Sequence, residues 1–426
     1  MSNKKISDLP QVTTLGANDK FYVVANGTSS YITKSNLLTQ LSTESVEYYG
    51  MIIHQSNSSP TTNIEYIGKN ANFTPMSVNL STGAVSLNDW VSMPTIVKNV
   101  PAMIKTNGTL DYYLNPNNYA KKLDGTTDSD VSNLNYDGNA FAWFEPIWMR
   151  IEATGTDLDV RFAYKQLDSS YFEVCPAGCG LWLPMFYGYY DGSKMRSIAG
   201  TSPLAGRTGN SNTATQYSSI TANGSNYMFY GGKVEECISL LQMMWFKTTN
   251  SDNVARGNQD GYNSSDTSTY GTKGNPVVNG GRFFGTSDGK SANKFLHCIP
   301  LATYDVWLRD PYFLTVNGEF KLSTDYTYDL TGATYKATGV LAPAQGYETF
   351  MTPIQGFGLV PTATGGNQST YYCDHFWINN TITSVSLRRG DCPDGRRAGG
   401  RALDCYNAAS VSYWDVGCAM MLKQTV

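Results

Sequence analysis

Short runs of alternating apolar and polar residues, separated by turn-forming residues, dominate this sequence. Near the start, KFYVVA and YIT flank the pair Asn26-Gly27, and such a pair between two β-prone runs predicts a β-hairpin. Ser35 stands where the N-cap of a short helix through Leu38 is expected. This hairpin module, residues 1–45, is too small to hold a core of its own, so it needs neighbours to be stable.

The pattern changes twice further along the chain. Residues 46–92 are rich in Asn, Ser and Thr with apolar residues in short alternation, which predicts a β-rich connecting segment of short strands. From Met93 the strands become richer in aromatic residues and the spacers longer, so we place one large C-terminal domain at 93–426. Residues 250–290, almost free of aliphatic side chains, predict a long loop that is functional or packs on a neighbouring subunit.

One stretch has the spacing of a helix. In VEECISLLQMMWF, residues 234–246, apolar side chains recur every three or four positions. This spacing predicts an amphipathic helix with Glu235 and Glu236 on its polar face.

Composition narrows the possible functions. Charged residues make up 15% of the 426-residue chain, against about 25% in typical domains, so the surface is expected to be largely neutral and polar. A net charge of −4 offers no basic surface for phosphates, and nucleic acid is not expected as a partner. The apolar stretches are too short to span a bilayer, and the N-terminus lacks the apolar region of a secretory signal. We therefore expect assembly in a cytoplasm, with no membrane insertion.

The sequence offers little catalytic or metal-binding chemistry. Of eight cysteines only Cys175 and Cys179 are close together, and since no second ligand pair follows, structural thiols are expected and no metal or cofactor is predicted. The three histidines have no metal-binding spacing, although His297 next to Cys298 and His375 next to Asp374 leave a catalytic arrangement imaginable. The carboxylates that qualify for glycosidase chemistry by residue type alone are Glu145, Glu152, Glu235 and Glu236.

The last forty residues carry a recognisable order of motifs. A strand at 383–387 leads into Arg389-Gly390, then Asp394-Gly-x-x-Ala-Gly, and the chain ends in a strand beginning near Trp414-Asp-x-Gly. This layout resembles the C-terminal signature of C-type-lectin-like domains of the formylglycine-generating-enzyme type, which phage tropism proteins use. The calcium-binding sugar tripeptide of animal lectins is absent, so calcium-dependent sugar binding is not implied. The arginine usually found near the end of the family's chains is also absent, so the resemblance does not imply the salt bridge that this arginine makes in relatives.

Upstream motifs support a related resemblance. The stretch from Met103 to Asn117, Tyr136-Asp-Gly-Asn, Ile147-Trp-Met-Arg-Ile and Arg196-Ser-Ile-Ala-Gly resemble large tail or fibre proteins of phages that infect gut bacteria. The N-terminal Ile6-Ser-Asp-Leu-Pro is similar to the particle-proximal ends of phage fibres.

These resemblances imply a fold and a role. The fold would be mainly β with an α+β part, an N-terminal β-hairpin module followed by a C-type-lectin-like domain. The protein would be a non-enzymatic tail or head fibre of a virion, a homotrimer that contacts other virion proteins through residues 1–45 and a host surface glycan or protein through its C-terminal domain. Two alternatives stay open, a virion-associated polysaccharide depolymerase and a purely architectural decoration protein.

In the lectin-like scaffold, side chains between the last strands would face outward, which points to residues 391–415 as the receptor-binding stretch. Aromatic, Asn, Ser and Asp side chains give adaptable contacts at low ordering cost, and Tyr406 and Tyr413 are the expected aromatic anchors. The predicted receptor-binding residues are Asp391, Asp394, Arg396, Arg397, Arg401, Asp404, Tyr406, Asn407, Ser410, Ser412, Tyr413 and Asp415. The competing interpretation makes Tyr413 and Trp414 core residues and the arginines partners in intersubunit ion pairs, and for Trp414 we prefer it.

Overall fold

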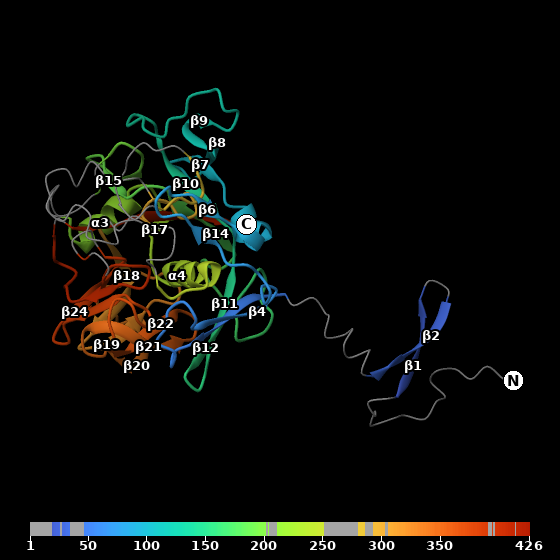
Figure 1. Cartoon of the computed structure of the whole chain (residues 1–426). Coiled ribbons are helices and arrows are strands. Elements are labelled where there is room, and N and C mark those ends of the chain that lie inside the picture. The colour runs from blue at the N-terminus through green and yellow to red at the C-terminus, as the bar shows by residue number, and fades with distance from the viewer. Residues whose placement is uncertain are drawn as a thin grey trace. The chain divides into compact units, whose positions relative to one another are not determined.

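The chain divides into two compact units, residues 1–47 and 48–426 (Figure 1). The computed structural model describes residues 19–25, 28–34, 47–201, 203, 211–250, 280–285, 293–302, 306–390, 394, 397–413 and 415–426. Strand makes up 41% of these residues and helix 11%, and one sheet is nearly closed and barrel-like. The prediction of a mainly β protein with few helices is confirmed.

The first unit contains the predicted hairpin. Strands β1 (Lys20–Ala25) and β2 (Thr28–Thr33) pair antiparallel with Ala25 opposite Thr28, so only two residues join them. This register matches the tight connection that an Asn-Gly pair favours. The strand prediction is confirmed, whereas Asn26-Gly27 and the helix start at Ser35 lie outside the described residues.

The second unit contains a five-stranded antiparallel sheet, which includes the first strand of the unit, β3 (Tyr49–His54). In order, its strands are β13 (Phe172–Glu173), β11 (Trp148–Thr154), β12 (Asp157–Ala163), β3 and β4 (Ile64–Gly68). Because β3 pairs with β12, much of the predicted connecting segment 46–92 is built into the large unit. This segment also contains the small pair β5 (Ser77–Val78) and β6 (Val85–Ser86) and the 3-10 helix η2 (Asn88–Ser92), and the short helix α2 (Pro94–Val97) follows it.

A seven-stranded sheet gathers strands from both ends of the large unit. Its order is β17 (Tyr227–Phe229), β27 (Met420–Thr425), β14 (Cys179–Pro184), β10 (Gly138–Phe144), β7 (Pro101–Lys105), β8 (Leu110–Asn115) and β9 (Asn118–Lys122). The last strand of the chain thus lies between β17 and β14. The pair β15 (Gly188–Tyr190) and β16 (Met195–Ser197) forms a separate small ribbon.

The third sheet has nine strands. The path of the sheet is β20 (Lys336–Leu341), β19 (Glu319–Leu322), β18 (Trp307–Val316), β24 (Thr383–Arg388), β25 (Leu403–Cys405), β23 (His375–Ile378), β21 (Gly346–Ile354) and β22 (Gly358–Thr364), and β26 (Val416–Gly417) runs parallel to β18. One of these strands, β25, belongs to the predicted receptor-binding stretch, residues 391–415, which we call the C-terminal stretch. The strand predicted at 383–387 is confirmed as β24.

The predicted helix is confirmed as α4 (Lys233–Phe246), which lies near the centre of the large unit (Figure 1). Every residue of α4 is buried, so it is a core helix and not one with a solvated face. Gly232, whose φ of 61° a side chain would strain, begins the helix, and Lys247 ends it in the left-handed region. None of the helices in the described part of the chain is long and apolar enough to cross a bilayer.

Helix α3 (Thr213–Thr221) depends on a side-chain cap. The Asn212 side chain accepts a hydrogen bond of 2.9 Å from the backbone N–H of Thr215. Replacing Asn212 by alanine is expected to lower the free energy of unfolding by about 1 kcal/mol, because this N–H loses its acceptor. Thermal unfolding of Asn212→Ala and Asn212→Asp checks this, since the aspartate variant retains a capping oxygen and should stay near the wild type.

Candidate functional site

The predicted receptor-binding stretch, residues 391–415, is anchored on helix α4 just before its start and near its middle. Before the stretch, the Arg389 guanidinium lies 2.9 Å from Glu235 Oε1 and donates to the Leu301 carbonyl at 2.8 Å. Near its middle, the Arg401 guanidinium lies 2.7 Å from Glu236 Oε2. All four side chains are buried. The prediction that Glu235 and Glu236 mark a polar, solvated face is therefore wrong, because the two buried carboxylates pair with Arg389 and Arg401 in the core.

A third arginine extends this buried ion network. Arg388, on β24, lies 3.0 Å from Glu236 Oε1 and 3.2 Å from Asp310 Oδ2. Asp310 also accepts backbone hydrogen bonds from Gly232 and Tyr312, at 3.0 and 3.1 Å. Burial alone would raise the pKa of Glu236, but the charges of Arg401 and Arg388 outweigh it and lower that pKa. Three arginines thus balance the carboxylates of Glu235, Glu236 and Asp310.

A row of aromatic rings lies on the nine-stranded sheet beside the C-terminal stretch. The ring centroids of Tyr347 and His375 are 5.2 Å apart, those of His375 and Trp377 4.2 Å, and those of Trp377 and Trp307 5.4 Å. We call these four residues the aromatic ladder. The first three are partly exposed, whereas Phe376 is buried in the core on the other face of β23. Burial lowers the pKa of His375 to about 4, so its ring is neutral at physiological pH.

Charged side chains surround the ladder. Strand β25 runs parallel to β23 and places Asp404 opposite Trp377. The Arg397 guanidinium lies 5.7 Å from the centre of the Trp377 ring and 3.3 Å from Asp394 Oδ1. Burial, opposed by a hydrogen bond from the Tyr406 N–H and reinforced by the charges of Asp394 and Asp415, raises the pKa of Asp404 to about 6. The result is a mixed acidic and aromatic surface with one arginine stacked on it.

The two predicted aromatic anchors are at the surface. Tyr406 is 51% exposed and Tyr413 52% exposed. The interpretation of Tyr413 as core packing therefore does not fit its exposure, while Trp414 lies outside the described residues. Tyrosines combine a large apolar ring with a hydroxyl and two soft torsions, so an exposed pair is well suited to contact a partner.

The other predicted residues fall into three groups. Arg397 and Ser410 are exposed, and Asp394, Asp404, Asn407, Ser412 and Asp415 are partly buried. Arg401 is buried, and its pairing with Glu236 is within the chain, so the expectation of a surface or intersubunit contact at this position does not fit its position in the core. Asp391 and Arg396 lie outside the described residues, as does most of the predicted loop 250–290.

Sequence reasoning did not place Tyr347, His375 or Trp377 at the candidate binding surface, although it considered His375 as a catalytic residue. The alternation in His375-Phe-Trp-Ile, with Phe376 and Ile378 buried, places Trp377 on the outer face of the sheet and was visible in the sequence. The parallel pairing of β23 with β25, which brings Trp377 to the C-terminal stretch, carries no local sequence signal.

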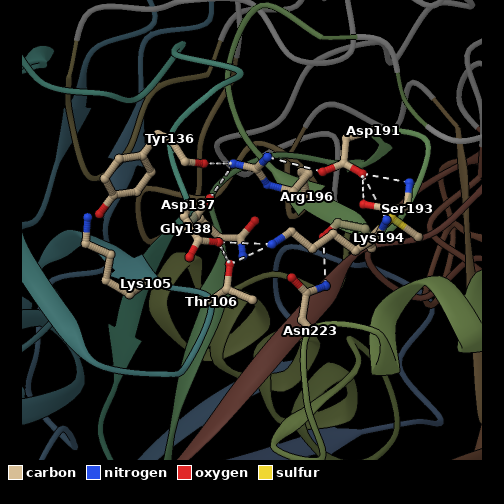
Figure 2. Close-up of polar contacts among 12 residues, drawn as sticks. Lys105, Thr106, Tyr136, Asp137, Gly138, Asp191, Ser193, Lys194, Arg196 and Asn223 are labelled. Atoms are coloured by element: carbon tan, nitrogen blue, oxygen red, sulfur yellow. Dashed lines mark hydrogen bonds and ion pairs between the residues drawn. The ribbon is translucent and has the colours of Figure 1, made fainter.

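Two of the upstream motifs meet in a second polar cluster, shown in Figure 2. The buried Arg196 guanidinium donates to the carbonyls of Tyr136 and Gly138, at 2.6 and 2.7 Å, and lies 3.3 Å from Asp191. Beside it Lys194 lies 3.0 Å from Asp137 (Figure 2). Since Arg196 binds main-chain carbonyls, we interpret this cluster as a structural contact that holds the β15–β16 ribbon against the segment before β10.

The residues considered for catalysis are occupied by structural contacts. His297 is buried, with Nδ1 2.7 Å from the Tyr119 hydroxyl, as expected for a structural histidine. The carboxylates singled out by type are each paired with a cation: Glu145 with Lys98, Glu152 with Arg150, Glu235 with Arg389 and Glu236 with Arg388 and Arg401. Within the described residues the seven cysteines are free thiols, and no group of three His, Cys, Asp or Glu side chains is placed to hold a metal ion.

No protein-family model matches the chain, and no curated protein matches it in sequence.

Proposed function

We propose that this protein is a structural component of a bacteriophage virion, a tail or head fibre or spike subunit that binds the host cell surface, and not an enzyme. The binding face would comprise the exposed part of the C-terminal stretch and the adjoining aromatic ladder. The resemblance of the C-terminal and upstream motifs to phage tropism and fibre proteins supports this role.

The observation that carries the proposal is the pair Tyr406 and Tyr413, each about half exposed, on a stretch anchored to the core. Arg389 and Arg401 fix this stretch to α4 through buried carboxylates. Rigid placement of exposed aromatic side chains lowers the entropy lost on binding, and such side chains dominate the energetics of interfaces.

The proposal also includes the type of the large domain, the role of the N-terminal unit and the oligomeric state. The large unit would be a C-type-lectin-like domain of the formylglycine-generating-enzyme type, which the mixture of sheets around one central helix supports. The N-terminal hairpin unit would attach the protein to the particle, and the assembled form would be a homotrimer in the virion. Sedimentation equilibrium at micromolar concentration tests the trimer, and a monomer would contradict it.

The double variant Tyr406→Ala and Tyr413→Ala is expected to reduce adsorption to host cells by at least about tenfold, because two anchors of the binding face are removed. Adsorption of the purified, labelled full chain to a susceptible strain measures this. The matched control is Tyr113→Ala with Tyr190→Ala, which removes two tyrosines of 40% and 41% exposure elsewhere on the molecule. Unchanged adsorption of a folded Tyr406/Tyr413 variant would place the binding face elsewhere.

Two further measurements separate the alternatives. Loss of capsular polysaccharide on incubation with the purified protein would favour a depolymerase and contradict the non-enzymatic role. Failure of the wild-type protein to adsorb to any susceptible strain would favour an architectural particle protein.

A further inference from the structure

A groove of about 550 Å³ lies between α3, β17, the middle of β18 at Tyr312, the turn after β19 and β27 at Lys423. Its volume is in the range of small-molecule sites. It shares no residue with the C-terminal stretch or the aromatic ladder. Its lining combines tyrosines with short polar side chains, and it includes Tyr217, Ser225, Asp325, Thr327, Tyr328 and Lys423.

The aromatic part of the lining includes a stacked pair of tyrosines, Tyr217 and Tyr328, beside which the buried Phe229 has the same orientation. The rings of Tyr217 and Tyr328 lie 3.7 Å apart at an angle of 6°, and Phe229 is parallel to both with centroids 6.4 and 6.3 Å away. Tyr217, from α3, and Tyr328, from the turn after β19, thus cover one face of each other and leave one outer face each, while Phe229 of β17 is buried beside the pair. The Tyr328 hydroxyl is buried and has no hydrogen-bond partner within the described residues. Such a group in a native structure calls for a partner, and the described residues do not supply one.

The polar part of the lining supplies acceptors and donors around the tyrosine pair. Asp325 Oδ1 accepts from the Thr327 N–H at 2.9 Å and the Ser323 hydroxyl at 3.2 Å, which fixes the orientation of the carboxylate. Asp325 is exposed at the groove, so Oδ2 is available to donors from solvent. Lys423 is the cation of the lining, which therefore contains one carboxylate and one ammonium group.

We propose that this groove binds a neutral pyranose unit of a glycan. A pyranose presents a flat face of weakly positive C–H groups, which stack on the negative face of a tyrosine ring, and a rim of hydroxyls, which donate to a carboxylate and accept from an ammonium. The charge balance of Asp325 and Lys423 favours a neutral sugar over a phosphorylated ligand, which would need several cations. This inference does not rest on the proposed host-binding role, because it concerns a different part of the molecule and is tested without host cells.

Saturation-transfer difference NMR with the full chain tests the proposal. The probes are methyl β-D-glucopyranoside, methyl β-D-galactopyranoside and N-acetylglucosamine. At least one is expected to give a signal, strongest at the C–H groups of one ring face. Arabinitol, an acyclic polyol with hydroxyls and no ring face, is the control probe and is expected to give none. No signal from any pyranose, or an equal signal from arabinitol, would overturn the proposal.

Variants locate the binding. Tyr217→Ala is expected to weaken the binding of the best pyranose about fivefold, because a stacking face is lost. Asp325→Asn, a substitution at an exposed side chain that preserves the fold, is expected to weaken this binding by a similar factor. Tyr113→Ala, a tyrosine outside the groove, should bind as the wild type does, and near-ultraviolet circular dichroism confirms folding of each variant. Binding that both Tyr217→Ala and Asp325→Asn leave unchanged would contradict a site in this groove.

Discussion

Replacing Glu236 by glutamine is expected to lower the free energy of unfolding by about 3–5 kcal/mol, the cost of leaving buried charges without their partner. Glu236 is fully buried and pairs with both Arg388 and Arg401, and it also accepts the Leu359 N–H at 3.1 Å. Glutamine retains the shape and loses the charge, so Arg401 loses its carboxylate partner at 2.7 Å. The midpoint of urea unfolding measures the effect.

The matched control for this prediction is Glu65→Gln, the same substitution at a carboxylate that is 64% exposed and pairs with His54 at 3.4 Å. An exposed pair contributes about 0–1 kcal/mol. Equal losses for the two variants would contradict the view that the buried network holds the C-terminal stretch.

Replacing Glu348 by glutamine is expected to change how stability depends on pH. Glu348 is fully buried, neither carboxylate oxygen has a hydrogen-bond partner within the described residues, and burial raises its pKa from 4.5 to about 8. Between these values the unfolded chain releases the proton that the folded chain keeps, so wild-type stability falls as pH rises. The stability of Glu348→Gln relative to the wild type should therefore increase by about 3 kcal/mol from pH 5 to pH 8.

Urea unfolding of both proteins at several pH values checks this expectation. The comparison depends on the slope of the difference and not on its size at one pH, because the buried amide of glutamine also lacks partners and adds a constant cost. A difference between variant and wild type that stays flat from pH 5 to pH 8 would show that Glu348 titrates near its ordinary range.

Local patterns in the sequence predicted local structure well. The 3/4 spacing of apolar residues predicted α4, and the alternation around Asn26-Gly27 predicted β1 and β2. The solvated face assigned to Glu235 and Glu236 was wrong because a charged residue in a helical pattern reads as exposed unless its partners are known. Those partners, Arg389 and Arg401, are more distant along the chain, and no residue near the helix in sequence indicates that they pair with it.

The candidate surface shows the same limit. The sequence drew attention to Tyr406 and Tyr413, which are exposed, because their residue type and position near the end of the chain were visible directly. It gave Arg401 the same status as Arg397, although one is buried and the other lies over Trp377. Whether an arginine points inward depends on the pairing of strands distant in sequence, and this pairing also created the aromatic ladder.

The position of β27 has a consequence for the order of folding. The strand lies between β14 and β17, both of which are synthesised long before it. Until residues 420–425 have left the ribosome, the facing edges of β14 and β17 lack the strand that joins them. Contacts between residues so distant in sequence make folding slow, and open strand edges attract other chains. The seven-stranded sheet can therefore be completed only once β27 has been synthesised, and until then the unpaired edges of β14 and β17 expose the nascent protein to aggregation.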